Sequence, residues 1–264
     1  MSNLTISPII PDLAFRESRW QHDDLPTLRA RLAEDGYLLM RGLLAPAPLL
    51  TARADILDLC RQAGWLRADA PLMAGIGDGI YRHERQEAYR PVYRQVVRLA
   101  TFNACAEDPA LLNLFRGLFA ADVQVHRRNI CRIAFPGGDQ PTQPHQDYHY
   151  IRGSSETYTC WIPTSDVPAE LGGLAVQPGS HHLGFLPHRR TIGAGGFGVD
   201  LDRPWAGGDF QLGDVLVMHS HMVHAARDHR DPERIRLSFD FRYQPAGQAI
   251  DPSSLCYHME DQSR

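Results

Sequence analysis

The fold of this chain is decided by residues 213–244, GDVLVMHSHMVHAARDHRDPERIRLSFDFRYQ. Within this stretch, residues 234–242 alternate strictly between polar and apolar side chains. Successive side chains of a β-strand point to opposite faces, so this alternation predicts a strand with one apolar and one polar face. The apolar face would consist of Ile235, Leu237, Phe239 and Phe241.

Similar segments precede it from about residue 121 onward, each rich in Val, Ile, Phe, Tyr or Thr and bounded by glycine and proline. They are VQVHRRNICRIAF (123–135), ETYTCWIPTSD (156–166) and GGLAVQPGSH (172–181). Short strands at such spacing are typical of an antiparallel sandwich or barrel. We therefore expect a barrel over about 121–245.

The region from about 24 to 120 has helical character instead. Leu25, Leu28 and Leu32 fall on one helical face, residues 49–66 are amphipathic, and 91–119 contain at least one further helix, with a short strand at YLLMRG (37–42). We expect a single domain over residues 1–264 that is mainly β, with these helices packed outside. The glycine-rich stretch 184–211 predicts a long, lid-like loop.

Composition narrows the function classes. The net charge of -4 gives no positive field for polyanions, so we expect no nucleic-acid partner. All 27 basic residues are arginine, which excludes a P-loop lysine and Schiff-base chemistry. Five cysteines without a CxxC pair favour neither a structural zinc site nor a disulfide framework, and no apolar run approaches the length of a membrane span. The N-terminus lacks a signal-peptide core, so we expect a cytoplasmic protein with no membrane partner.

One local pattern suggests a metal. In PHQDYHY (144–150), His145 and Asp147 are two apart on a segment that we expect to be extended, so both side chains would reach one ion. A lone HxD is a weak signal, and Asp147 in a turn at the strand end is an equally simple interpretation. A facial set of two histidines and one carboxylate needs a third ligand, for which the chain offers His219, His221 and His224.

The polar face of the strand at 234–242 is a second signal. Its side chains are those of Arg234, Arg236, Ser238, Asp240 and Arg242. They could simply face solvent. Alternatively, they line the interior of the barrel, where arginine would supply a planar fork for a carboxylate ligand.

The motifs DGYLLMRGLL, HQDYHY, TCWIPTSDVPAELGGLAVQPGSH, GDVLVMHSHMVHAA and RLSFDFRYQ occur in this order over roughly residues 34–244. In this ordered set the chain resembles the phytanoyl-CoA dioxygenase family of iron(II)- and 2-oxoglutarate-dependent oxygenases. The resemblance implies a double-stranded β-helix, a jelly-roll or cupin-like fold of two antiparallel sheets. It also implies Fe(II) as metal, 2-oxoglutarate as cosubstrate and O2 as oxidant, with oxidation of a small molecule that we expect to be polar.

The resemblance assigns roles residue by residue. His145, Asp147 and His224 resemble the metal ligands, whereas His219 is better explained by packing, His221 by a surface turn and His181 by a turn. Arg236, with Ser238 beside it, would bind the distal carboxylate of 2-oxoglutarate, and Arg234 is the second candidate. Trp161 would line the cosubstrate pocket. Asn129 could contact the cosubstrate or make a structural hydrogen bond.

Two features qualify this assignment. Ala226 stands where a serine of the family often contacts the cosubstrate, so that contact would be missing. Asp147 stands where related halogenases carry a small residue, which favours hydroxylation or a related dehydrogenation. Around the metal motif, Tyr148, His149, Tyr150 and Arg152 could meet the substrate, as could Asp240 and Arg242. The alternatives are a cupin-like metal hydrolase or isomerase, which would not need a barrel arginine, and a binding protein without turnover.

Overall fold

The computed structural model describes residues 8–138, 141–191 and 195–260 as two facing sheets with helices on one side. The larger sheet has the strand order β2 (Glu17–Ser18), β3 (Tyr37–Met40), β11 (Val215–His219), β6 (Tyr158–Pro163), β13 (Arg236–Pro245) and β4 (Val123–Val125), and β5 (Ile130–Ala134) also pairs with β13. The smaller sheet has the order β1 (Leu13–Ala14), β10 (Ala206–Gly207), β7 (Leu174–Val176) and β12 (His224–Ala226). The predicted mainly β fold of two sheets is confirmed, but across the described residues the two ladders stay separate and do not close into a barrel.

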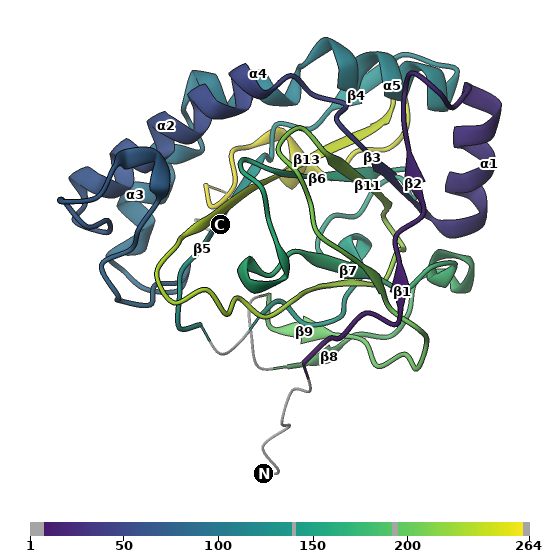
Figure 1. The fold of residues 1–264 in the computed structure, drawn as a ribbon. Helices are drawn as coiled ribbons and strands as arrows, with labels where there is room; N and C mark the ends of the chain where they lie inside the picture. The colour runs from purple at the N-terminus through teal and green to yellow at the C-terminus, as the bar shows by residue number, and fades with distance from the viewer. Residues whose placement is uncertain (1–7, 139–140, 192–194, 261–264) are drawn as a thin grey trace.

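Helices cover the outer face of the larger sheet (Figure 1). They are α1 (Leu25–Asp35), α2 (Pro46–Gln62), α3 (Tyr89–Val96), α4 (Ala100–Ala106) and α5 (Pro109–Phe119). The start of α1 is fixed by Asp24, whose side chain accepts a hydrogen bond from the backbone N–H of Thr27, and its end by Gly36, which adopts a left-handed conformation at φ 76°. In the described part of the chain, no helix is both long and apolar enough to span a bilayer.

The alternation of β13 decides where its side chains go. Leu237, Phe239 and Phe241 are fully buried in the core beneath the helices, where the rings of Phe239 and Phe102 lie 4.9 Å apart. The opposite face points between the two sheets. Arg236, Ser238, Asp240 and Arg242 all lie there and all are buried, so the solvent-facing interpretation of this face is wrong.

A second apolar core fills the space between the sheets, and it contains Phe15, Trp161 and Phe210 among its larger side chains. The rings of Trp161 and Phe210 lie 4.6 Å apart. Polar groups of the larger sheet are therefore held beside an apolar wall rather than in water.

The stretch 184–211 has more structure than a long loop. It contains β10 and a small two-stranded sheet of β8 (Arg189–Arg190) and β9 (Phe197–Gly198), while residues 192–194 lie outside the described residues. The remaining elements are short 3-10 helices, namely η1 (Leu72–Ala74), η2 (Asp147–His149), η3 (Ala169–Leu171), η4 (Ser180–Leu183) and η5 (Pro252–Leu255).

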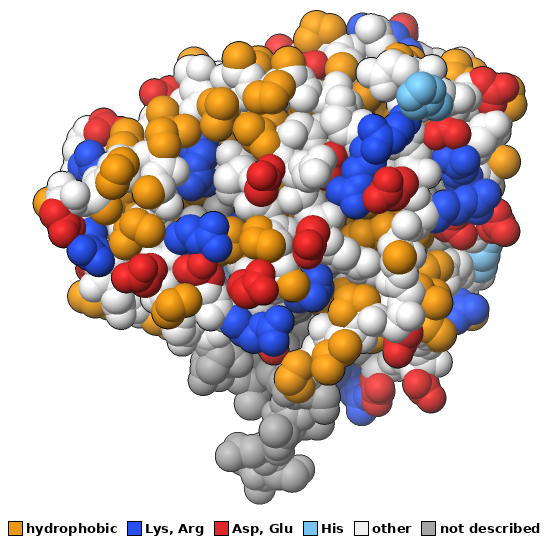
Figure 2. All heavy atoms as spheres, viewed as in Figure 1, with side chains coloured by type: hydrophobic (Ala, Val, Ile, Leu, Met, Phe, Trp, Pro, Cys, Tyr) orange, Lys and Arg blue, Asp and Glu red, His pale blue; other side chains and the backbone are white. Residues whose placement is uncertain are grey.

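The surface carries charges of both signs. On the face in Figure 2, acidic and basic side chains are interspersed and neither sign forms a continuous field. This face offers no electrostatic footprint for a polyanion.

Candidate metal centre

His145, Asp147 and His224 converge between the two sheets. Their ligand atoms all lie within 4.8 Å of one another, and all three residues are buried. His145 and His224 exchange both backbone hydrogen bonds, each at 3.0 Å, so the backbone fixes the separation of the two imidazoles. The two rings lie 4.2 Å apart.

The predicted strand does not continue through Asp147. The chain turns after His145, and Asp147 begins the 3-10 helix η2. The backbone N–H groups on either side of Asp147 do not pair with a neighbouring strand. The N–H of Gln146 donates to Nε2 of His188, and that of Tyr148 donates to the carbonyl of Ser220. The two side chains still reach one point, but a turn places the carboxylate there, not strand alternation.

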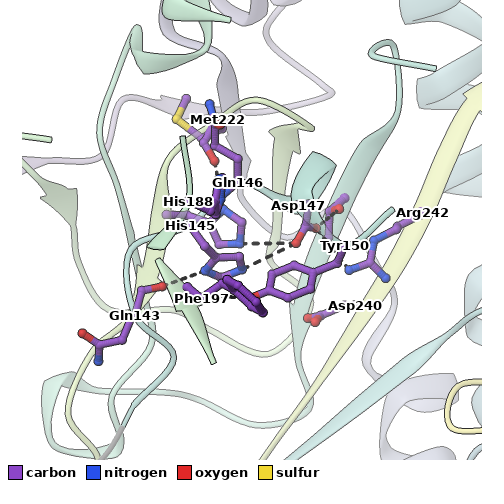
Figure 3. A network of polar contacts seen from close by, with 12 residues as sticks. Gln143, His145, Gln146, Asp147, Tyr150, His188, Phe197, Met222, Asp240 and Arg242 are labelled. Carbon is purple, nitrogen blue, oxygen red and sulfur yellow. Dashed lines mark hydrogen bonds and ion pairs between the residues drawn. The ribbon is translucent and has the colours of Figure 1, made fainter. Parts of the chain in front are cut away.

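Hydrogen bonds orient both imidazoles. Nδ1 of His145 lies 2.7 Å from the carbonyl oxygen of Gln143, and Nδ1 of His224 lies 3.0 Å from that of Met222. A carbonyl only accepts, so each Nδ1 carries the proton and each Nε2 presents its lone pair. Both Nε2 atoms face Asp147, as Figure 3 shows for His145. Burial lowers the pKa of His224 to about 4, so this ring is neutral at pH 7.

The carboxylate of Asp147 uses its two oxygens differently. Oδ2 accepts a hydrogen bond from Oγ1 of Thr159 at 2.5 Å and an ion-pair contact from Nη2 of Arg242 at 3.1 Å. Oδ1 faces Nε2 of His145 at 3.6 Å and Nε2 of His224 at 3.8 Å. Burial alone would raise the pKa of Asp147, but the charge of Arg242 opposes it and is the largest contribution that holds this pKa well below its ordinary value.

These three atoms suit a metal ion. The separations between Oδ1 and the two Nε2 atoms exceed hydrogen-bond length. Ligand atoms about 2.1 Å from one ion and at right angles lie about 3 Å apart, so the observed set needs only a small contraction to bind. Two imidazoles and one carboxylate on one side of an ion leave its other positions open, as in non-haem iron oxygenases.

A cavity beside the three ligands contains the predicted cation. Arg236 lines it together with Trp161, Leu174 and Met218. The Nη1 group of Arg236 donates to the carbonyl of Gly172, and its guanidinium carbon lies 5.7 Å from the ring centre of Trp161. Burial lowers the pKa of Arg236 to about 10, which leaves the group charged at pH 7.

Several buried polar atoms here lack a partner within the described residues. They are Nε of Arg236, Oγ of Ser238 and Nε1 of Trp161. Buried donors without partners are costly, so a polar ligand or ordered water in this place would stabilise the arrangement. Ala226 also lines the cavity, with a methyl group where the family often has a hydroxyl.

Two predicted cosubstrate contacts lie elsewhere. Arg234 precedes β13, is 44% exposed and pairs with Asp231 at 2.7 Å, so it does not point into the cavity. Asn129 precedes β5, and its side-chain amide donates to Oδ1 of Asn103 at 3.0 Å, on the side of the helices. Neither residue lines the cavity beside the three ligands, which favours Arg236 over Arg234 and the structural hydrogen bond for Asn129.

The other histidines have local partners. Nε2 of His181 lies 3.1 Å from the carbonyl of Ala33, so the ring contacts α1. His219 ends β11 with its ring 5.3 Å from that of Tyr158, and His221 is half-buried with its ring 4.7 Å from that of Tyr148. None of the three belongs to the group that could hold a metal in the described part of the chain.

Thr159 and Arg132 line the cavity but were not among the predicted site residues. Thr159 lies two residues before Trp161 on β6 and therefore shares its face, so the strand period could have indicated it. Arg132 lies on β5, where its neighbours Cys131 and Ile133 belong to the core beneath the helices and Arg132 faces the cavity. The sequence signal for Arg132 was the presence of a charged residue within an otherwise apolar strand.

Comparison with known proteins gives the class of this fold and site. The family model described as phytanoyl-CoA dioxygenase (PhyH) matches residues 32–236. The chain belongs to this family, as its motifs predicted. It is 29% identical over 244 residues to a 1-deoxypentalenic acid 11-beta-hydroxylase of Streptomyces arenae, covering 85% of this chain and 82% of the relative, and equally so to the hydroxylase of that name from Streptomyces exfoliatus.

Solved structures share the fold at lower identity. The non-heme alpha ketoglutarate dependent epimerase SnoN matches with a TM-score of 0.61 and 22% identity over 88% of this chain and 87% of that chain. The carbocyclase SnoK matches with a TM-score of 0.62 and 19% identity over 94% of this chain and 92% of that chain. These likenesses support the double-stranded β-helix architecture.

Proposed function

We propose that this protein is an Fe(II)- and 2-oxoglutarate-dependent dioxygenase that hydroxylates, or otherwise oxidises, a small organic molecule. The observation that carries this proposal is the convergence of two imidazole Nε2 atoms and one carboxylate Oδ1, beside a buried arginine in the same cavity. A hydrolase or isomerase with the same ligands would need no such cation, so Arg236 favours the oxygenase. A binding protein without turnover would not need ligand atoms that leave part of the ion open.

The three ligands would hold Fe(II) from one side. Bound iron, with 2-oxoglutarate and O2, supplies the oxidising chemistry, in which the cosubstrate is converted to succinate and CO2. Thr159 and Arg242 contact Oδ2 of Asp147, so Asp147 would offer Oδ1 to the metal and leave other positions open for small molecules.

The cosubstrate site is the half of the cavity around Arg236. This guanidinium would pair with the distal carboxylate of 2-oxoglutarate, while Ser238 and Trp161 supply the donors that lack partners in the structure. Trp161, Leu174 and Met218 exclude water from this half, which strengthens each charge interaction.

The outcome of the oxidation follows less directly. The named activities of similar proteins include hydroxylation, epimerisation and carbocyclisation. The carboxylate at Asp147 favours hydroxylation or dehydrogenation over halogenation. The cytoplasmic location and the small-molecule substrate expected from the sequence remain predictions.

Turnover of 2-oxoglutarate tests the proposal. Purified protein with Fe(II) and O2 should form succinate slowly without substrate, and faster when a screened compound is the true substrate. His145→Ala, Asp147→Ala and His224→Ala should each form none, while Arg116→Gln, an exposed arginine on α5, should match the wild type. Succinate formation that persists in the three alanine variants would rule the proposal out.

A further inference from the structure

A second cavity adjoins the metal cavity. It shares Thr142, Ala226, Arg132 and Arg236 with the metal cavity, so the two spaces meet at these side chains. Its volume is about 150 Å³. A cavity of that size with apolar walls has room for a six-membered carbon ring.

The walls of this second cavity combine aromatic and charged side chains. The aromatic ones are Tyr81, Tyr89, Tyr93 and Phe135, and the charged ones include Glu84 and the arginines discussed below. The rings of Tyr89 and Tyr93 stack at 5.4 Å, and both residues are buried. The aromatic part of the cavity is therefore suited to an apolar body.

Two arginines, Arg132 and Arg236, stand where the two cavities meet. Nε of Arg132 donates to Oδ2 of Asp240 at 2.9 Å, and 32% of the Arg132 side chain is accessible. Because Arg132 lines both cavities, this accessible surface faces them. Burial alone would lower the pKa of Arg132, but Asp240 and Glu84 raise it overall, so the group stays a cation.

The guanidinium of Arg132 has a second edge, which is formed by Nη1 and Nη2. Asp240 contacts Nε, and no hydrogen bond of the Nη1 and Nη2 groups is found among the described residues. A planar fork with two parallel N–H groups matches a carboxylate better than it matches a neutral carbonyl. Two further cations line this second cavity besides Arg236. Arg82 donates through both Nη groups to Asp78, at 2.6 and 2.7 Å, and Nη1 of Arg227 donates to the carbonyl of Gly208.

We propose that Arg132 determines substrate specificity and that the substrate is an apolar, ring-containing carboxylic acid. Its carboxylate would pair with the free edge of Arg132, and its apolar body would fill the aromatic cavity. This inference rests on the proposed function, in which Arg236 is reserved for 2-oxoglutarate. The two arginines are distinguishable, since Arg236 has no carboxylate within ion-pair distance in the described part of the chain, whereas Arg132 pairs with Asp240 through Nε.

A pair of matched probes tests the proposal by calorimetry. Cyclohexanecarboxylate and its neutral amide share one shape and differ in charge. They are titrated anaerobically into the protein loaded with Fe(II) and 2-oxoglutarate, and also into metal-free protein. The carboxylate should bind about tenfold more tightly than the amide in both forms, the gain typical of a charge-assisted contact.

Arg132→Gln should remove that preference and leave the affinity for 2-oxoglutarate within twofold, because glutamine can still donate to Asp240. Arg82→Gln should retain the tenfold preference. Asp240→Asn keeps Arg132 but removes its ion pair, and it should retain or increase the preference for the carboxylate. A loss of that preference in Arg132→Gln would then be due to the missing guanidinium and not to the broken ion pair.

Equal binding of the two probes by the wild type would overturn the proposal, as would a preference retained in Arg132→Gln. A large loss of 2-oxoglutarate affinity in Arg132→Gln would also overturn it, by placing Arg132 in the cosubstrate site. Failure of the proposed function has a separate sign: the wild type would then bind no 2-oxoglutarate in the presence of Fe(II), before any probe is added.

Discussion

Nη2 of Arg242 lies 3.1 Å from Oδ2 of Asp147, on the side of the carboxylate opposite His145 (Figure 3). Arg242 is itself 2% exposed, and its Nη1 and Nε groups have no partner among the described residues. The contact joins β13 to the start of η2 and sets the direction in which Asp147 presents its other oxygen.

Loss of this contact should weaken metal binding. Arg242→Gln leaves Thr159 to hold Oδ2 of Asp147 without the ion pair, and changes to groups that orient ligands typically cost 10–100-fold in metal affinity. Titration with Mn(II), followed by its paramagnetic resonance signal, measures the change. Arg152→Gln, an exposed arginine near the same motif, should bind Mn(II) like the wild type. Unchanged affinity in Arg242→Gln would show that the contact does not orient the ligand.

The two neighbouring arginines should separate in their effect on the cosubstrate. Arg236→Gln should weaken 2-oxoglutarate binding about 10- to 100-fold, since it removes a charge-assisted pair in a dry cavity. Arg234→Gln should change it less than twofold, because Arg234 is exposed and pairs with Asp231. Anaerobic calorimetry of the Fe(II) form gives both constants. A larger loss of 2-oxoglutarate affinity in Arg234→Gln than in Arg236→Gln would show that Arg234 binds the cosubstrate.

Acid should destabilise the fold through a buried histidine. His126 is 1% exposed, with Nε2 2.9 Å from Oε1 of Gln244, and burial lowers its pKa from 6.5 to about 4. Between these values the unfolded chain binds a proton that the folded chain does not, so the stability that His126 contributes is complete above pH 6.5 and is lost as the pH falls to about 4.

The loss amounts to at most about 1.4 kcal/mol per pH unit. His126→Gln keeps a polar group but removes the titration. Urea unfolding at pH 7 and pH 5 should therefore show a smaller loss of unfolding free energy in this variant than in the wild type, by about 1 kcal/mol. An equal loss of unfolding free energy in both proteins would show that protonation of His126 does not contribute to the acid destabilisation.

Sequence patterns could predict those features of the fold and site that depend on a single segment of the chain. The alternation of β13 put Phe239 and Arg236 on opposite faces, and the spacing of His145 and Asp147 indicated a shared ion. The resemblance to the family then selected His224 from three candidate histidines and the interior for Arg236. Each of these follows from side-chain direction within one segment or from the ordered motifs of the family.

What could not be predicted depends on pairing between distant segments. The register of β13 against β6 sets Arg242 opposite Thr159, and both then reach Asp147. No local pattern fixes that register. The turn at Asp147 likewise depends on partners such as His188 and Ser220, which lie far along the chain. The strands β1 and β2 have two residues each, too short to show any period.

The most direct test of the central claim is the visible absorption of the protein with Fe(II) and 2-oxoglutarate in the absence of oxygen. Chelation of iron by the cosubstrate should give a weak metal-to-ligand charge-transfer band in the wild type. The band should be absent in His145→Ala, Asp147→Ala and His224→Ala, and should require far more 2-oxoglutarate in Arg236→Gln. A wild type without the band, or a band that survives loss of His224, would contradict the metal centre described above.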